Sequence, residues 1–170
     1  MTPRVALDRG LGELALALPA GGREQLLEYL TLLAKWNRTY NLTAIRAPLA
    51  MVSHHLLDSL AVLPHLPMPS ASQKKAAFLR QAVIELGLSN VEVYEGRVQA
   101  WRPAARFAVV ISRAFAELAE FAAACRHLVA PRGFLAAMKG KVPQDTLGCE
   151  IVKLTVPLLD AERHLVLCRA

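Results

Sequence analysis

The sequence lacks the long apolar run of a membrane-spanning helix. No stretch reaches the ~18 apolar residues that a bilayer requires. Residues 1–22 carry Asp8 and Glu13 within their apolar part, which argues against a secretory signal. The 170 residues are 54% hydrophobic and 20% charged, which is typical of a globular chain with one domain or one domain and a small appendage.

Cysteine is scarce and forms no metal-ligand pattern. Cys125, Cys149 and Cys168 contain no C-x-x-C pair, and no histidine stands at ligand spacing from them. We therefore expect no metal site. We expect three small buried side chains in a reducing, cytoplasmic compartment, with a catalytic thiol as the alternative.

The familiar catalytic motifs are absent too. There is no P-loop, G-x-S-x-G, H-E-x-x-H or G-x-G-x-x-G, which disfavours the hydrolases and phosphoryl-transfer enzymes that carry them. The net charge of +6 favours an RNA, DNA or membrane partner, although many basic proteins are merely soluble.

Apolar spacing predicts a helical N-terminal unit. Residues 23–36 and 48–63 carry i, i+3, i+4, i+7 stripes, and the stretch WNRTYNLTAI (36–45) between them reads as a polar loop. Asn41 and Thr43 in this loop are candidates to face a cleft. The proline-rich segment PHLPMPSAS (64–72) is a candidate linker, so we divide the chain into 1–67 and 68–170.

The second part predicts an α/β sheet whose last two strands are antiparallel. We expect helix 73–86, closed by Gly87, and helix 115–129, with a turn at APRG (130–133). The expected strands are VEVY (91–94), FAVVIS (107–112, buried on both faces), 134–140, 151–156 and 164–169.

Several polar residues are candidates for chemistry. Arg113 follows strand 107–112, where an open α/β sheet presents its crevice, and is either functional or a loop cap. His55 has Asp58 three residues later, which makes a structural pair or a catalytic one. Lys74 and Lys75 stand at the start of a helix, where an anionic partner would offset their charge; solvated lysines are the alternative.

The segment KWNRTYNLTAIRAPLAMVSHHLLDSLAVL (35–63) resembles the N-terminal signature of the RsmG family, also called GidB. The resemblance continues in family order through 74–98, 111–118, 134–143 and 156–167. It implies a class I S-adenosylmethionine-dependent methyltransferase, with a Rossmann-like α/β sheet and an N-terminal helical extension. The implied activity is methylation of N7 of one guanine in the decoding region of 16S ribosomal RNA, on small-subunit rRNA or the 30S subunit. We expect no membrane or metal partner, and we expect a monomer, although the sequence does not settle the oligomeric state.

The resemblance also suggests site residues. We expect catalytic roles for Arg113, Asn41 and His55, and cofactor contacts from Val98, Gln99 and Arg113. For RNA we select basic side chains: Arg46, Lys74, Lys75, Arg97 and Lys139, with Arg102 and Arg106 as further phosphate contacts. Guanine N7 has a lone pair and no proton to remove, so alignment matters more than a general base.

One departure from the family stands out. Its members place a strand, a loop resembling DVGSGAGLPG, a helix and a second strand where this chain has only PHLPMPSASQ (64–73), and 144–150 is also short. Either the protein carries a segment that this sequence does not contain, or it lacks the segment and its cofactor loop. We favour the first, because 74–98 keep the family pattern and because losing two central strands would expose strand 107–112. A catalytically silent RNA-binding remnant and a methyltransferase for a non-RNA substrate are the competing hypotheses.

Overall fold

A computed structural model describes residues 1–66, 76–113, 115 and 117–169. Lys74 and Lys75 lie outside this part of the chain. Contacts between Cα atoms group the chain into two compact units, residues 1–61, 73–94 and 156–160 in the first and residues 62–72, 95–155 and 161–170 in the second. Each unit is described by itself below.

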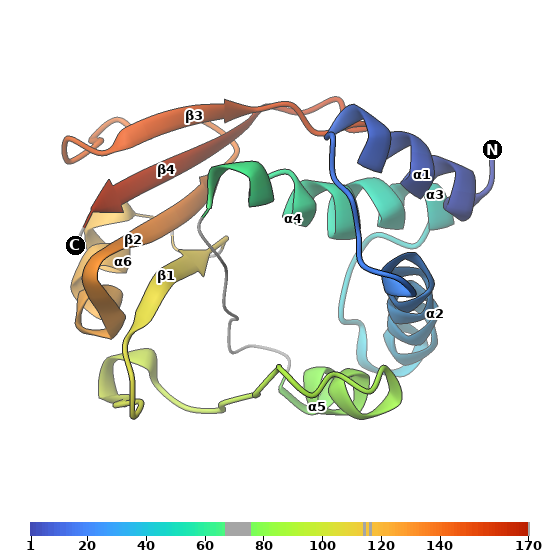
Figure 1. Cartoon of the computed structure of the whole chain (residues 1–170), viewed down its shortest axis with the longest axis horizontal. Coiled ribbons are helices and arrows are strands. Elements are labelled where there is room, and N and C mark those ends of the chain that lie inside the picture. Colours follow the sequence, from blue (N-terminus) through green and yellow to red (C-terminus); the bar gives the residue numbers. More distant parts are fainter. Residues whose placement is uncertain (67–75, 114, 116, 170) are drawn as a thin grey trace. The chain divides into compact units, whose positions relative to one another are not determined.

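The first unit is helical (Figure 1). It contains α1 (Pro3–Glu13), α2 (Gly22–Tyr40), α3 (Pro48–Met51), α4 (Asp58–Leu60) and α5 (Ala76–Glu85), and a π-helical turn (Val52–Leu57) joins α3 to α4. These helices share one core with fully buried side chains such as Leu7, Val52 and Leu57. The predictions of helices over 23–36 and 48–63 are confirmed, and helix 73–86 is confirmed where the chain is described.

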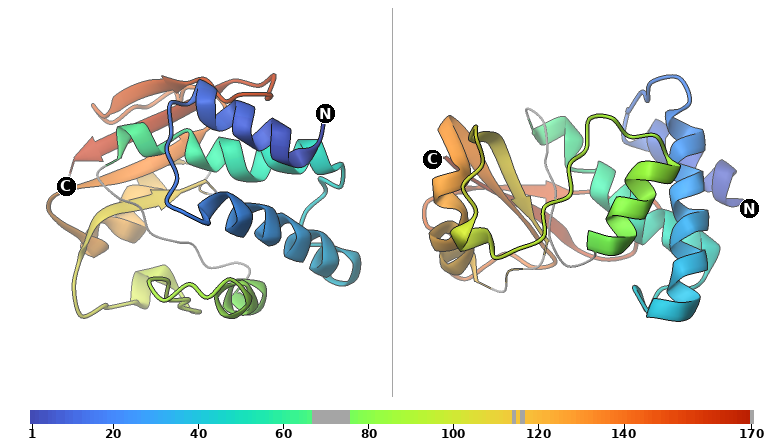
Figure 2. Two further views of the ribbon diagram at one scale, coloured as in Figure 1. Left: turned by 45° about the vertical axis from the view of Figure 1, so that its right-hand side comes forward. Right: turned by 90° about the horizontal axis from the view of Figure 1, so that it is seen from below.

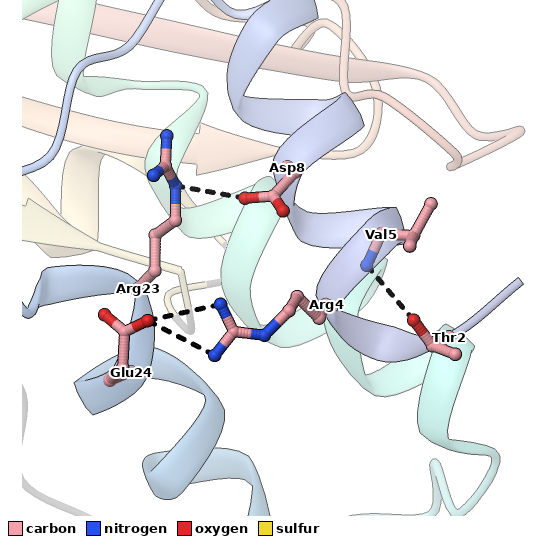
Figure 3. A network of polar contacts seen from close by, with 6 residues as sticks. All are labelled: Thr2, Arg4, Val5, Asp8, Arg23 and Glu24. Atoms are coloured by element: carbon pink, nitrogen blue, oxygen red, sulfur yellow. Dashed lines mark hydrogen bonds and ion pairs between the residues drawn. The ribbon is translucent and has the colours of Figure 1, made fainter.

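Helix α1 was not expected, although its start has a sequence signal. Thr2 accepts a hydrogen bond at Oγ1 from the Val5 N–H (3.3 Å), and Pro3 occupies the first helical turn. Figure 3 shows how α1 meets α2 through exposed ion pairs, Arg4 with Glu24 at 3.2 Å and Arg23 with Asp8 at 3.0 Å. Backbone hydrogen bonding at the start of α2, followed by Arg4, lowers the pKa of Glu24. Such exposed pairs contribute little stability, so the buried leucines hold this contact.

Helix α5 lies alongside α2 (Figure 2). Phe78 is buried against two aromatic rings of α2, with ring centroids 5.7 Å from Tyr29 and 5.9 Å from Trp36. The helix ends at Gly87 (φ +62°), where the Leu88 N–H donates to the Val83 carbonyl and the Gly87 N–H donates to the Ile84 carbonyl. This pair of bonds is a Schellman cap, and it confirms the predicted helix end.

The second unit contains a four-stranded sheet in the order β1-β2-β4-β3. Its strands are β1 (Phe107–Ser112), β2 (Val129–Lys139), β3 (Glu150–Leu154) and β4 (Arg163–Arg169). Strand β1 is parallel to β2, whereas β2–β4 and β3–β4 are antiparallel. The predicted α/β class with an antiparallel end is confirmed.

Both faces of the sheet are covered. Helix α6 (Leu118–Cys125), followed by a 3-10 turn (Arg126–Leu128), packs Leu118, Phe121 and Cys125 against one face. Val62 and Leu66 pack against the other face, beside buried residues that include Val109 and Leu165. Helix α6 also makes the crossover that two parallel neighbours require.

Three strand and turn predictions need correction. Residues 91–94 form no strand, because no described strand pairs with them and a single strand is not stable. Strand β1 is not buried on both faces: only Val109 is buried, because β1 is the end strand of the described sheet. The segment APRG (130–133), expected as a turn before the strand, lies inside β2, where the register with β1 shifts and Arg132 has φ +64°. The helix expected over 115–129 is shorter and covers only Leu118–Cys125.

The prediction of buried cysteines is correct for Cys125 and Cys168, whereas Cys149 is half-buried, and the sequence did not indicate a disulfide. Cys125 is free and buried, and burial raises the pKa of its thiol. Cys149 and Cys168 form a disulfide, with Cα atoms 4.6 Å apart. The antiparallel register, in which Glu150 pairs with Leu167, places them opposite each other, and sequence spacing alone does not reveal this. No helix within the described part of the chain has the length and hydropathy to cross a membrane.

We predict that Gly133→Ala lowers the free energy of unfolding by about 2–3 kcal/mol in urea denaturation. A Cβ at Gly133 would lie 2.7 Å from the Ala108 carbonyl oxygen and 2.9 Å from that of Ala130, both of them backbone atoms. Gly140→Ala is the matched control, because nothing lies within 4 Å of its added Cβ. Equal effects of the two changes would contradict the close approach of β1 and β2 at Gly133.

We predict that the purified, unreduced protein exposes one thiol per chain on denaturation and three after reduction. The disulfide of Cys149 and Cys168 accounts for the difference, since Cys125 is the third cysteine. Alkylation followed by intact mass measures the count. Three alkylated thiols without a reductant would show that the cross-strand bond does not form.

Candidate functional site

The loop that follows α2 begins at Asn41, which has a left-handed backbone (φ +47°). Its N–H donates to the Asn37 carbonyl (3.3 Å), so Asn41 ends the helix. Asparagine tolerates this conformation better than most residues. Residues 37–40, expected in a loop, therefore form the last turn of α2.

A buried asparagine then fixes the loop. Asn37 is only 5% exposed, and its Oδ1 accepts a hydrogen bond from the Thr43 N–H (2.8 Å). Thr43 Oγ1 accepts from the Ile45 N–H (3.1 Å) and lies 3.1 Å from His55 Nε2. Side chains from α2, the loop and the π-helical turn thus form one connected network, which we call the Asn37 network (Asn37, Thr43, Ile45 and His55).

The π-helical turn explains how His55 reaches the loop. A π turn widens the helix and frees a carbonyl from the regular α-helical ladder, and such turns are frequent at functional sites. Here the Ala50 carbonyl oxygen accepts from Ser53 Oγ (3.2 Å) and lies 2.9 Å from His54 Nδ1. His54 is therefore directed back along its own helix, while its neighbour His55 is directed to Thr43.

Arg46 lies on the exposed side of this loop. Its Nη2 donates to Asn41 Oδ1 (3.1 Å), and both residues are exposed. An arginine has five N–H donors, so the hydrogen bond to Asn41 leaves most of the donors of Arg46 directed to solvent. The predicted residues Asn41, Arg46 and His55 thus lie around one short loop.

The second group of predicted residues lies at the carboxyl ends of β1 and β2. Because the two strands are parallel, Arg113, which follows β1, and Lys139, which ends β2, are at the same edge of the sheet. Arg113 is exposed. Lys139 Nζ donates to the Phe115 carbonyl (2.7 Å), so this lysine holds the segment that follows Arg113.

Val98 and Gln99 form a short 3-10 turn (Val98–Ala100) before β1. Val98 packs against the α6 side of the sheet, whereas Gln99 lines an open depression of about 640 Å³ together with Arg97 and Ala100. Arg102 Nη1 stabilises the turn by donating to the Gln99 carbonyl (2.7 Å).

The two sets of predicted cofactor residues are attached to opposite ends of β1. Trp101, two residues after Gln99, stacks on Phe107 at the start of β1 (ring centroids 5.4 Å apart) and its carbonyl oxygen lies 3.1 Å from His127 Nε2. Arg113 follows the other end of the strand. Six residues of strand separate these ends by about 17 Å, at roughly 3.3 Å per residue.

These residues do not make a complete site for S-adenosylmethionine. The ligand of an open α/β sheet lies at the carboxyl ends of neighbouring strands, but in the described sheet only β1 and β2 are parallel neighbours with Arg113 and Lys139 at their ends. The sequence also holds no glycine-rich loop that lets backbone approach a cofactor. Among the described residues, no group of three or more His, Cys, Asp or Glu is placed to hold a metal ion.

Sequence reasoning missed Asn37 and the structural bond of Lys139. Asn37 continues the apolar spacing of Leu26, Leu30 and Leu33 by four residues, and a polar residue on such a stripe is a signal for a buried hydrogen bond. The bond from Lys139 to Phe115 has no comparable signal, because it depends on the tertiary fold. The site roles proposed for Asn41, His55, Arg46, Arg97, Val98, Gln99, Arg113 and Lys139 stay predictions.

Comparison with known proteins adds a further finding. Residues 22–71 and 69–165 match the model of the GidB family, described as rRNA small subunit methyltransferase G. Two relatives named "Ribosomal RNA small subunit methyltransferase G" come from Methylobacillus flagellatus and Laribacter hongkongensis. The first is 46% identical to this chain, and the alignment covers 94% of this chain and 95% of the relative. The second is 44% identical, and the alignment covers 98% of each chain. A relative with the same name from Burkholderia thailandensis is 41% identical, and the alignment covers 97% of this chain and 90% of the relative. The similarity extends through both compact units.

We predict that Asn37→Ala lowers the free energy of unfolding by about 2 kcal/mol, because the partly buried Thr43 N–H then loses its acceptor. Arg46→Ala is the control in the same loop and should change stability by less than about 0.5 kcal/mol, because its bond to Asn41 is exposed. Urea denaturation at constant pH gives both values. If the two variants were equally stable, the loop would not depend on Asn37.

Proposed function

The chain belongs to the GidB family, rRNA small subunit methyltransferase G, and we propose that it methylates N7 of a guanine in 16S ribosomal RNA with S-adenosylmethionine as the methyl donor. The single observation that carries this proposal is identity of 41–46% over at least 94% of the chain to relatives that bear this name. The donor supplies an activated methyl group, and the lone pair of guanine N7 needs no general base.

The geometry of the described residues supports two roles. Arg113 is exposed at the carboxyl edge of the sheet, where a guanidinium N–H can donate to guanine O6 and leave N7 open to methylation. Lys139 keeps the segment beyond Arg113 in place through the Phe115 carbonyl, so we assign it a positioning role beside its charge. Val98 and Gln99 remain our candidates for donor contact.

The loop of the helical unit is the proposed RNA contact. Arg46 is exposed beside Asn41, and the Asn37 network holds the backbone beneath both residues. Arg97 is exposed in the second unit and adds a phosphate contact. A basic chain of net charge +6 gains affinity for RNA by releasing counterions.

The proposed substrate also suggests a location and a state of the protein. We propose that the protein works in the cytoplasm, as a monomer, on small-subunit rRNA or the 30S subunit. Because thiols are kept reduced in that compartment, we expect the bond between Cys149 and Cys168 to open there and to close in air.

The test is the methylation state of 16S rRNA in a strain without this gene. We predict that one guanine loses its N7 methyl group, measured by mass mapping of rRNA fragments, and that the natural gene restores it. In the restored strain, Arg113→Ala should lower methylation at least 100-fold, since the variant loses the charge-assisted hydrogen bond that we propose between Arg113 and guanine O6. An unchanged guanine in the deletion strain would overturn the rRNA assignment.

Arg169→Ala is the matched control for Arg113→Ala. Arg169 is also an exposed arginine of the sheet, but it pairs with Phe134 in the middle of β2, five residues before Lys139 at the carboxyl edge. It should leave methylation within about twofold of the natural level. Equal loss in both variants, or normal methylation with Arg113→Ala, would show that Arg113 has no special place in the reaction.

A further inference from the structure

Three exposed arginines stand close to one cross-strand pair at the start of the two parallel strands. Phe107 begins β1 and pairs with Val129, which begins β2, so the two starts lie side by side (Figure 1). Arg106 directly precedes Phe107. Arg126 lies three residues before Val129, and Arg132 lies three residues after it. These exposed cations thus share the edge of the sheet that is opposite to the carboxyl edge.

An irregularity in the pairing keeps Arg132 near this edge. Between two consecutive pairs of the register, β1 has only Ala108, whereas β2 has residues 130–133. The extra residues form a bulge, so β2 advances little along β1 before Arg132. Arg132 has a left-handed backbone there (φ +64°), which costs a non-glycine residue on the order of 1 kcal/mol. Backbone strain of this kind is concentrated at functional sites.

No described carboxylate neutralises the three arginines. None of the ion pairs among the described residues includes Arg106, Arg126 or Arg132. Glu150 shares an open depression of about 320 Å³ with Arg126, but it lies at the start of β3, and β4 separates β3 from β2. Like charges without counterions raise the local potential, so this edge favours an anionic partner.

The ordinary roles of surface arginines account for only part of this arrangement. Arg126 stands in a helical turn that follows α6, where a cation offsets the helix dipole by ~0.3–1 kcal/mol. Arg169 ends β4 nearby, but its guanidinium lies over the Phe134 ring (5.3 Å), so we do not count it among the contacts. Within the described part of the chain, neither Arg106 nor Arg132 has a partner of either kind.

The distance to the carboxyl edge indicates which part of an RNA would meet these arginines. Seven positions separate Arg106 from Arg113, and seven separate Arg132 from Lys139. At roughly 3.3 Å per strand residue, the two edges lie about 20 Å apart. One nucleotide at the carboxyl edge does not reach so far, whereas a duplex with ~3.4 Å per base pair covers this distance in about six pairs. Arginine suits phosphate, because its planar donors bind two oxygens at once.

We propose that Arg106, Arg126 and Arg132 form a second RNA-binding surface, which holds phosphates of small-subunit rRNA about 20 Å from the guanine that is methylated. The identity of the RNA rests on the proposed function. The surface lies outside the candidate methylation site, and it adds a contact that fixes the orientation of the RNA without reading its sequence.

The test measures the binding of labelled 16S rRNA by fluorescence anisotropy at several salt concentrations. We expect the triple change Arg106→Ala, Arg126→Ala and Arg132→Ala to weaken binding at least about 50-fold at ~0.15 M salt. The slope of log K against log[salt] becomes less steep by roughly 2–3, because each lost phosphate contact removes ~0.7–0.9. Changing the same three residues to lysine keeps the charge and should leave binding within about 5-fold of the natural protein.

The matched control is the triple change Arg4→Ala, Arg9→Ala and Arg23→Ala. It also removes three positive charges, so each triple alanine variant has a net charge of +6 − 3 = +3. Each control arginine already has a carboxylate within 2.7–3.2 Å, so its charge is neutralised in place. The control should bind 16S rRNA within about 3-fold of the natural protein. Thermal unfolding verifies that every variant is folded.

Three results would overturn the inference. In the first, the variant without Arg106, Arg126 and Arg132 binds 16S rRNA as tightly as the control. In the second, the lysine variant loses as much affinity as the alanine variant, which shows that charge is not the cause. In the third, the natural protein binds vesicles of roughly one-third phosphatidylglycerol in phosphatidylcholine through these arginines, which makes a membrane surface the partner.

The outcome separates this inference from the proposed function. If the three arginines are needed to bind 16S rRNA but the deletion strain keeps its methylated guanine, the proposed function fails and the second surface stands. If the deletion strain loses the methyl group but both triple alanine variants bind 16S rRNA equally well, the inference fails and the proposed function stands.

Discussion

Hydrogen bonding along both sides of β2 is the constraint on which the second unit depends. Its parallel neighbour β1 requires a crossover, and the segment with α6 provides it and covers one face of the sheet. Its antiparallel neighbour β4 then pairs with β3, which places Cys149 opposite Cys168. The parallel pairing of β1 with β2 brings Arg113 and Lys139 to one edge. The disulfide and the candidate site thus both follow from the position of β2 in the sheet.

A single buried amide has a comparable role in the helical unit. Asn37 is among the few buried polar side chains of the described chain, and a buried polar group without a partner costs about 1–3 kcal/mol. The bond to Thr43 removes that cost and fixes the loop that carries Arg46. The exposed Asn41, which seemed the more functional residue in the sequence, ends a helix. The surface available to a ligand is therefore held from below by a residue that a ligand need not touch.

Local features of this fold could be predicted from the sequence, and features that need a distant partner could not. Apolar spacing located α2, and Gly87 located the end of α5, because both signals act within a few residues. Residues 91–94 have the alternation of a strand, but a strand also needs a neighbour, and the described sheet offers none. The pairing of Cys149 with Cys168 and the bond from Lys139 to Phe115 depend on strand register, which no spacing rule gives.

The candidate site follows the same division. Arg113 could be selected because a strand pattern ends just before it, and the structure places it at the expected edge. The interpretation of Gln99 as lining the same crevice assumed a strand over residues 91–94, and in the described part of the chain these residues form no strand. Trp101 packs on Phe107, so the turn with Gln99 is attached to the start of β1.

The two units differ in how far their side chains are enclosed by the described residues. The helical unit closes its own core, and the Asn37 network is complete within α2, the loop and the π-helical turn. The described sheet instead ends at β1, an apolar strand of which only Val109 is buried. Its one pair of parallel strands ends at Arg113 and Lys139. Because ligands of such sheets lie at the ends of neighbouring parallel strands, the proposed donor contact needs more of the fold than the proposed RNA contact at Arg46, which needs one short loop.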